Sequence, residues 1–176
     1  MIQVTEKVQL IQATPDDANE IYQAIDENRE SLRTWLPFVD SSKSATVTRT
    51  FLENTKVTGE LAYMIRYENI FAGLIGLRGI DKANHKAEIG YWLVPSFEGK
   101  GLVTQSCLKL IEYAFEELDL NRILICVAVG NKRSRMVPAR LGFLEEGIER
   151  DGELLVSGYT DLVRYSLLKR EFDEGL

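Results

Sequence analysis

PSFEGKGLVTQSC, residues 95–107, separates an apolar run that predicts a strand from a run that predicts a helix. Gly99 and Gly101 flank Lys100 at this junction, and glycine lets the backbone approach a ligand that a Cβ would hold off. A strand that enters such a turn and then a helix leaves backbone N–H groups without partners. These groups and the helix dipole together bind anions such as phosphate. The pattern therefore predicts either a tight connection or a phosphate cradle.

The glycine turn alone does not decide between these two readings. The G-x-x-x-x-G-K-[ST] spacing of a P-loop is absent, and no third glycine or repeated βαβ pattern completes a dinucleotide-binding fingerprint. Lys100 would either add a point charge to the cradle or face solvent. Neighbouring sequence has to supply the rest of the evidence.

Composition restricts the class of protein. With 176 residues, 45% of them hydrophobic and 27% charged, the chain suits one soluble globular domain. No run approaches the roughly 20 apolar residues that span a bilayer. The first residues alternate as in a strand and lack the apolar core of a signal peptide, so we expect a cytoplasmic protein.

Charge and cysteine usage exclude several partners. Lys and Arg number 21 and Asp and Glu 27, a net charge of −6, which disfavours nucleic acid or an anionic membrane but tolerates a cationic amine. Cys107, Cys126 and the single His85 cannot form the usual zinc ligand sets, so no metal is expected. Both thiols are interpreted as small buried hydrophobes.

The chain before residue 60 predicts one strand and several helices. Thr14 is a plausible N-cap, followed by a first-turn proline, and Pro37 interrupts any longer helix. The expected elements are a strand over 3–12, a helix opened by TPDD at 14–17, a loop or short helices over 31–44, and a helix over 44–57.

Beyond residue 60 the periodicity changes to that of strands. The run 85–95 is apolar on both faces and should be central, and Glu68 and Asn69 predict a tight hairpin turn. No repeat or linker is present, so we expect one α+β domain over 1–176. The expected elements are strands over 61–68, 70–81, 85–95 and 122–129, a helix after the glycines, a helix over 131–143 ending at Gly142, and a closing antiparallel pair over 144–150 and 154–168.

The run AEIGYWLVPSFEGKGLVTQSCLKLIEYAFEELDLNRILICVAVGNKRSRMVPARLGFLEEGIER, with LRTWLPFVD near the start, resembles the GNAT superfamily of acetyl-CoA-dependent N-acetyltransferases. It is most similar to the group that includes the ribosomal-protein alanine and serine N-acetyltransferases. The order and spacing of these landmarks carry the resemblance over nearly the whole chain. It implies a GNAT fold with about seven mostly antiparallel strands in a mixed sheet, splayed in the middle, with helices on both faces.

The resemblance also implies acetyl-CoA as co-substrate, with its pantetheine arm lying between the splayed strands. Two positions depart from the Q/R-x-x-G-x-G/A pattern: Glu98 and Val103. A carboxylate facing a pyrophosphate would be repelled, so we expect Glu98 to point away and backbone N–H groups to bind. The residues expected to contact coenzyme are Trp92, Leu93, Val94, Gly99, Lys100, Gly101, Leu102, Val103, Thr104, Asn131 and Arg133.

Acetyl transfer to an amine needs a base and a proton donor. No Ser–His–Asp or Cys–His set suggests a covalent intermediate, so direct attack in a ternary complex is expected. Glu88 is the candidate base, because partial burial among apolar neighbours would make its carboxylate a stronger base. The alternatives for Glu88 are a structural pairing with an arginine or a solvated strand position.

Asn131 and Ser134 open the helix after the strand over 122–129. Asn131 is an ordinary N-cap by its position, and the resemblance adds a contact with the pantetheine arm. Ser134 is a candidate proton donor to the coenzyme sulfur, with capping or solvent contact as the alternative. A backbone N–H around Leu93 or Val94 would hold the thioester oxygen.

Trp35, Leu36 and Phe38 are the expected wall of the acceptor site, although they could simply cap the core. The resemblance implies that the acceptor is the α-amino group of a protein, a ribosomal one. A small amine such as a polyamine, amino acid or drug is the second reading, and an acyl-CoA-binding module without turnover is the third. Tyr91 and Trp92 are expected in the core or against coenzyme, and the family's dimers make a homodimer possible.

Overall fold

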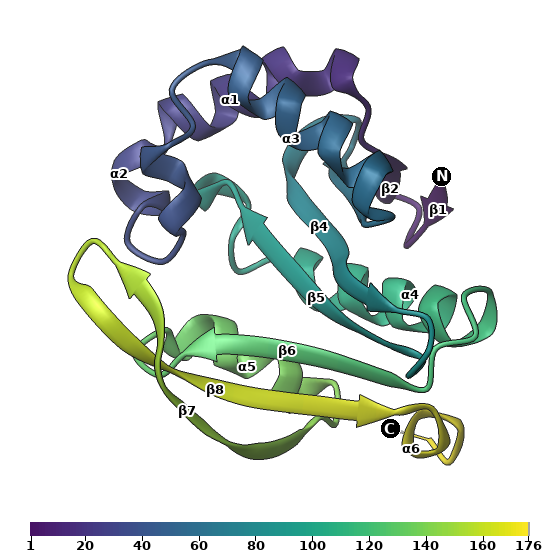
Figure 1. Ribbon diagram of the computed structural model, residues 1–176. Coiled ribbons are helices and arrows are strands. Elements are labelled where there is room, and N and C mark those ends of the chain that lie inside the picture. The colour runs from purple at the N-terminus through teal and green to yellow at the C-terminus, as the bar shows by residue number, and fades with distance from the viewer. Residues whose placement is uncertain (176) are drawn as a thin grey trace.

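A computed structural model describes residues 1–175 and arranges them around one mixed sheet (Figure 1). Within these residues, eight strands lie in the order β1-β2-β3-β4-β5-β6-β8-β7, and only β5 and β6 are parallel neighbours. The strands are β1 (Ile2–Gln3), β2 (Val8–Gln12), β3 (Leu61–Tyr67), β4 (Ile70–Asp81), β5 (Lys86–Leu93), β6 (Arg122–Ala128), β7 (Leu144–Leu155) and β8 (Gly158–Leu168). The predicted α+β architecture with a mostly antiparallel sheet is confirmed.

Helices make up the rest of the ordered elements. They are α1 (Ala18–Glu27), α2 (Arg29–Leu32), α3 (Ala45–Thr58), α4 (Leu102–Glu116), α5 (Lys132–Arg140) and α6 (Lys169–Asp173), with 3₁₀ turns over Pro15–Asp17, Pro37–Asp40 and Pro95–Phe97. The predicted helices over 44–57, after the glycines and over 131–143 are confirmed. None of the helices within residues 1–175 has the length and apolarity needed to span a bilayer.

The N-terminal strand prediction is wrong in one respect. Residues 3–12 form two strands, because the N–H groups of Val4 and Thr5 both donate to the carbonyl of Val8 and reverse the chain. Ile2 consequently pairs with Leu10 in an antiparallel ladder. The sheet gains one edge strand beyond the number that the resemblance implies.

Of two turns predicted from local sequence, one is confirmed and one is misplaced. Glu68 (φ 50°) and Asn69 (φ 67°) form the predicted tight turn between β3 and β4. The boundary of the closing pair is wrong, because β7 continues through two irregularities and turns only after Leu155. Asp151 adopts φ 50° at the second irregularity, which carries the strand past the turn signal at Asp151–Gly152.

Three helices, α1, α3 and α4, cover the two faces of the half of the sheet that contains β2 to β5, whereas α5 lies against β6 and α6 against β8 (Figure 1). α4 packs on one face, where its apolar side chains join one buried cluster, and α1 and α3 pack on the other face with a second buried cluster. On the α1–α3 side, the second cluster reaches β5 and includes no residue of β6, β7 or β8. A polar strip with ion pairs Arg122–Glu146 and Arg164–Glu149 runs along those three strands instead.

The sheet separates between its two central strands. β5 and β6 pair in parallel only at Lys86–Arg122, Ala87–Ile123 and Glu88–Leu124. Beyond Glu88, β5 continues against β4 and β6 continues against β8, so the two halves of the sheet diverge. This is the predicted splay, and it opens directly onto the glycine turn at the end of β5.

Candidate active site

The glycine turn presents a row of free backbone donors at the start of α4. Gly99 (φ 77°) and Gly101 (φ 74°) adopt left-handed conformations that favour glycine. Within residues 1–175, none of the backbone N–H groups from Gly99 to Thr104 has a hydrogen-bond partner; the N–H of Gln105 is the first to bond back, to the carbonyl of Gly101. Six successive donors at the N-terminus of a 15-residue helix fit a phosphate or pyrophosphate.

A groove of about 750 Å³ runs from this turn across to α5. We name it the glycine groove. Most of the expected coenzyme contacts line it, namely Trp92, Leu93, Gly99, Gly101, Leu102, Val103, Thr104, Asn131 and Arg133. Lys100 and Val94 do not line it.

Lys100 and Val94 have other partners that account for this. The Lys100 ammonium lies 5.0 Å from the ring centroid of Tyr67 and 5.2 Å from that of Phe97, a cation–π arrangement beside the turn. The N–H of Val94 donates to the carbonyl of Ala72 across the β4 side at 2.8 Å. The N–H of Val94 is therefore not available to hold a thioester oxygen.

The alternation of backbone directions in β5 identifies the available donor. Because Val94 bonds toward β4, Trp92 also faces β4, while the N–H and carbonyl groups of Tyr91 and Leu93 face the gap. These groups lie beyond the last β5–β6 pairing at Glu88. Of the two donors expected from the sequence, Leu93 fits the role.

β6 offers matching groups from the other side of the gap. The N–H of Val129 donates to the carbonyl of Asp161 in β8, so by the same alternation Cys126 and Ala128 direct their backbone groups toward β5. Unpaired strand groups on both sides can take up the amides of an extended ligand in place of a missing strand. A pantetheine arm has amides of this kind.

We expected Glu98 to point away from the groove, but it does not. Its carboxylate lines the groove and pairs with the Arg133 guanidinium from the first turn of α5. The physical reason is that both the Arg133 guanidinium and the positive N-terminal end of α4 attract a carboxylate at this position. The pair joins the two sides of the glycine groove.

Asn131 and Ser134 lie at the inner end of the groove. The Asn131 side chain accepts the Ser134 N–H at 3.2 Å, which confirms Asn131 as the N-cap of α5. Ser134 Oγ donates to the Tyr91 hydroxyl at 3.0 Å, and that hydroxyl donates to the Ser134 carbonyl at 3.1 Å. Burial raises the pKa of Tyr91 above its usual range, so its hydroxyl stays protonated.

Glu88 pairs with an arginine, which was one of the alternatives that the sequence left open. Its carboxylate pairs with Arg78, directly opposite on β4, and it lines neither the glycine groove nor the second cleft described next. Glu153, on the irregular part of β7, lines that second cleft together with Arg78. Burial raises the pKa of Glu153, Arg78 acts in the opposite direction, and Glu88 raises it further.

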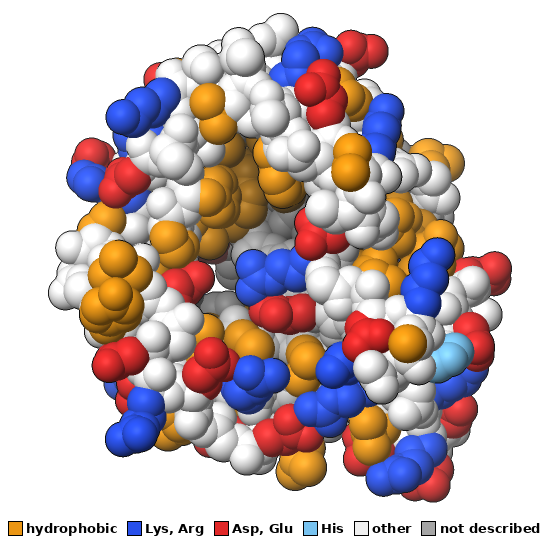
Figure 2. All heavy atoms as spheres, in the orientation of Figure 1, with side chains coloured by type: hydrophobic (Ala, Val, Ile, Leu, Met, Phe, Trp, Pro, Cys, Tyr) orange, Lys and Arg blue, Asp and Glu red, His pale blue; other side chains and the backbone are white. Residues whose placement is uncertain are grey.

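The second cleft, the central cleft, holds about 560 Å³, a volume typical of small-molecule sites. Figure 2 shows the molecule hollowed at its centre, with hydrophobic side chains gathered on one side of the hollow and charged ones on the other. The hydrophobic residues of the 35–51 segment that line it, the apolar wall, are Trp35, Leu36, Pro37, Phe38, Val47 and Phe51. Arg78 and Glu153 line the cleft from the sheet.

The two clefts meet. The residues that line both of them are Trp35, Leu36, Tyr91, Trp92, Asn131 and Ser134. A ligand that enters along the glycine groove therefore reaches, at these residues, a ligand that enters by the central cleft. Such an arrangement suits the transfer of a group from one to the other.

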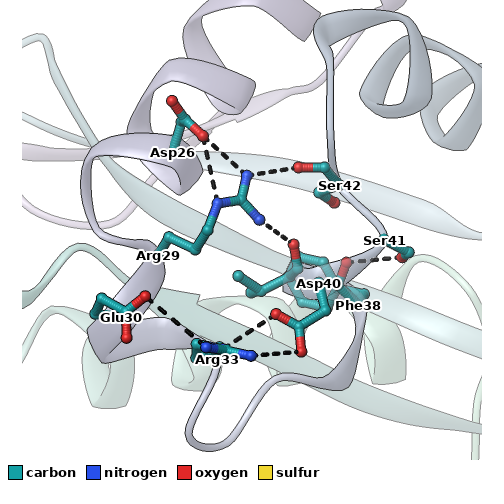
Figure 3. Close-up of polar contacts among 9 residues, drawn as sticks. Asp26, Arg29, Glu30, Arg33, Phe38, Asp40, Ser41 and Ser42 are labelled. Atoms are coloured by element: carbon teal, nitrogen blue, oxygen red, sulfur yellow. Dashed lines mark hydrogen bonds and ion pairs between the residues drawn. The ribbon is translucent and has the colours of Figure 1, made fainter.

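Polar contacts fix the segment that carries Trp35 and Phe38 (Figure 3). Arg29 donates to the carbonyls of Val39 and Ser42, the latter at 2.7 Å, and pairs with Asp26 at 2.9 Å. At the other end, the Trp35 ring lies so close to Gly130 that a Cβ there would be 3.1 Å from it. The expected substrate wall is thus anchored to both the helices and the β6–α5 turn.

A splayed sheet that ends in a glycine turn with free amides, beside a second cleft, fits a transferase whose donor is extended and carries phosphate, as an acyl-coenzyme A does. The acetyltransferase (GNAT) domain family matches residues 7–144, and the chain belongs to this family of N-acetyltransferases.

The relatives place it within the family. "Putative ribosomal N-acetyltransferase YdaF" of Bacillus subtilis (strain 168) is 44% identical over 176 residues, covering 97% of this chain and 96% of that protein. The ribosomal-protein-serine acetyltransferase of Escherichia coli (strain K12) is 31% identical over 172 residues, 94% of each chain. A solved RimL ribosomal L7/L12 alpha-N-protein acetyltransferase in complex with coenzyme A superposes with a TM-score of 0.92 at 27% identity, covering 97% of this chain and 98% of that chain. The fold is the GNAT fold.

Proposed function

We propose that this protein transfers the acetyl group of acetyl-CoA to the N-terminal α-amino group of a protein, a ribosomal protein by analogy with its relatives. The observation that carries the proposal is the junction of the glycine groove with the central cleft at Ser134 and Tyr91. The coenzyme A complex of the RimL relative supports coenzyme A as the ligand, and the names of the relatives support the acceptor class.

The glycine groove suits acetyl-CoA in three parts. The amides from Gly99 to Thr104 would bind the pyrophosphate, with Arg133 free to turn from Glu98 to a phosphate. The strand groups that face the gap, those of Tyr91 and Leu93 on β5 and Cys126 on β6, would bind the pantetheine amides and the thioester oxygen. Bound acetyl-CoA supplies the acetyl group already activated as a thioester.

Two carboxylates are proposed to take the proton from the acceptor ammonium, directly or through water. Glu153 lines the central cleft and has a raised pKa, two properties of a general base. Glu88, the residue expected from the sequence, pairs with Arg78 and would take the proton only through water, or would instead hold the Arg78 guanidinium in place. The neutral amine then attacks the carbonyl carbon and the C–S bond breaks.

Ser134 is proposed to return a proton to the departing sulfur. Its hydroxyl donates to the Tyr91 hydroxyl, which donates in turn to the Ser134 carbonyl, so these contacts hold the Ser134 side chain at the junction of the two clefts. The proton that the attacking nitrogen loses as the amide forms would restore the Ser134 hydroxyl through solvent. Retained turnover in Ser134→Ala would reduce Ser134 to an architectural residue. Coenzyme binding measured in parallel would separate loss of chemistry from loss of the site.

The acceptor class is tested by thiol release from acetyl-CoA, with product mass as a second readout. Peptides with free N-termini, the same peptides blocked at the N-terminus, and a panel of polyamines, amino acids and amine drugs are compared. Release with the free peptides alone supports the proposal, and release with small amines alone favours the second reading. Coenzyme-induced thermal stabilisation without release from any amine would indicate a binding module.

A further inference from the structure

We propose that the apolar wall of the central cleft binds the second residue of the acceptor peptide, and that this residue has a large apolar side chain. The inference rests on the proposed function, since it assumes a peptide acceptor. It names the property of the acceptor that the cleft would select.

The apolar wall exposes hydrophobic side chains to solvent. Its four large exposed side chains are Trp35 (36% exposed), Phe38 (40%), Val47 (41%) and Phe51 (48%). Single exposed apolar residues are ordinary on proteins, but several that line one side of one cleft mark a binding surface. Val47 and Phe51 are one helical turn apart on α3, so they present one continuous strip.

The wall is continuous with the place of transfer. Trp35 and Leu36 line both clefts, and the rest of the wall lines the central cleft alone. The first residue of an acceptor has its amine, and therefore its backbone, at this junction. The second residue, about 3.3 Å further along an extended chain, is the first that can place its side chain along the part of the wall beyond the junction, which is formed by Pro37, Phe38, Val47 and Phe51.

A buried hydroxyl in the same cleft lacks a partner. Thr48, 4% exposed on α3 beside Val47, lines the central cleft, and its Oγ1 has no hydrogen-bond partner within residues 1–175. Buried polar groups are rarely left unpaired. A hydroxyl can accept from a peptide N–H or donate to a carbonyl, so the acceptor backbone would satisfy Thr48 while the neighbouring wall takes a side chain.

The wall is also held in place before a ligand arrives. Arg29 ties the carbonyls of Val39 and Ser42 to α2, and Arg33 pairs with Asp40 at 3.1 Å (Figure 3). A fixed surface loses little conformational entropy on binding, which favours selectivity for side-chain shape. A linear polyamine has no side chain to place on this surface, so it would bury less carbon there than a Leu or Phe side chain.

The test uses peptides that differ only at residue two, with Leu, Phe, Ala, Asp or Lys, and measures kcat/KM for each. We expect Leu or Phe to exceed Asp and Lys by about tenfold or more. Phe51→Ser should reduce this ratio at least severalfold, while coenzyme-induced thermal stabilisation stays unchanged. Val57→Ser is the matched control, because Val57 is 85% exposed on the same helix and does not line the cleft.

The outcomes separate the two proposals. If no peptide is acetylated at any residue-two identity, the proposed function itself fails. If peptides are acetylated with equal kcat/KM for Leu and Asp, the acceptor class stands and the inference about the wall is wrong. If Phe51→Ser changes the mass in light scattering and leaves the peptide preference intact, a second copy of the chain covers the wall, and the inference is again wrong.

Discussion

The glycine groove and the central cleft recognise their ligands by different means. The groove presents main-chain donors from one continuous segment, Gly99 to Thr104, with strand groups of β5 and β6 behind them. The cleft presents side chains from segments far apart in the sequence, including Phe51, Arg78, Glu153 and Ser134. Backbone recognition suits a coenzyme that many enzymes share, whereas side-chain recognition suits the choice of an acceptor.

This difference predicts how each cleft responds to substitution. In the groove, a side chain matters mainly where a Cβ would alter the backbone or occupy ligand space, as at the glycines. In the cleft, the identity of the side chain itself carries the chemistry. Three substitutions, two of them paired with a comparison variant, test this contrast, beginning with the largest expected effect.

Glu153→Gln should lower kcat by about 10²–10⁴-fold and leave coenzyme binding unchanged, because it removes a general base from the central cleft without altering the groove. Its carboxylate works only when ionised, so the wild-type rate should fall as the pH drops through its raised pKa. The Gln variant should no longer show this fall in rate at low pH, the acid limb of the profile. A profile of kcat/KM against pH, with coenzyme titrated separately, provides the measurement.

Glu88→Gln is the matched comparison for this prediction. If Glu88 holds Arg78 in place, its loss should reduce turnover less than the loss of Glu153 and should keep the acid limb. A decrease of 10²–10⁴-fold in Glu88→Gln with little effect in Glu153→Gln would instead assign the base to Glu88. Unaltered turnover in Glu88→Gln would show that Glu88 neither acts as the base nor positions Arg78 for turnover.

Gly101→Ala should weaken coenzyme binding by about tenfold, because it strains the turn that aims the amides into the groove. Gly101 has φ 74°, and Gly59 at the end of α3 has the same φ 74°. Both substitutions should cost roughly 1–2 kcal/mol of unfolding free energy, from the left-handed conformation alone. Calorimetric coenzyme titration alongside urea unfolding measures both quantities.

Gly59→Ala separates strain from ligand contact. A Cβ at Gly59 would meet no atom within 4 Å, and this residue lines neither cleft. We expect it to lose stability with an unchanged coenzyme affinity. Equal loss of affinity in the two variants would contradict a local role for the Gly101 amides.

The groove could be predicted from sequence because its signals are local. A central strand, two glycines and an apolar-periodic helix follow one another over residues 86–116, and each has its own backbone requirement. The hairpin at Glu68–Asn69 was predictable for the same reason. These features do not depend on which distant side chain lies opposite.

The central cleft could not be predicted to the same extent. Glu153 enters it only because β7 continues past Asp151 through an irregular stretch, whereas the local turn signal favours a chain reversal there. Arg78 becomes its neighbour through the β4–β5 ladder and the splay. The only sequence signal for Glu153 is a carboxylate beside an apolar strand, which is typical of many solvated positions.

The partners of the charged side chains at the groove could not be predicted from the sequence either. Electrostatics predicted that Glu98 would avoid an incoming phosphate, but Arg133 is 35 positions away and comes near only when α5 packs beside α4. Lys100 likewise finds Tyr67 and Phe97, one of them on β3. Long flexible side chains take the nearest counter-charge or ring, and that neighbour is a property of the tertiary structure.

Glu98→Gln should have the smallest effect, tightening coenzyme binding a few-fold. The substitution removes a negative charge from the groove and frees Arg133 for a phosphate, but both groups are solvent-accessible, so screening limits the gain. The affinity should also become more salt-dependent, since an unpaired Arg133 then contributes fully. Titrations at two ionic strengths measure this, with a pantetheine fragment lacking phosphates as the control whose affinity should not change. Weaker coenzyme binding in Glu98→Gln would mean that the carboxylate positions Arg133 for the phosphate. The glycine groove would then also depend on side chains, and the contrast with the central cleft would be one of degree.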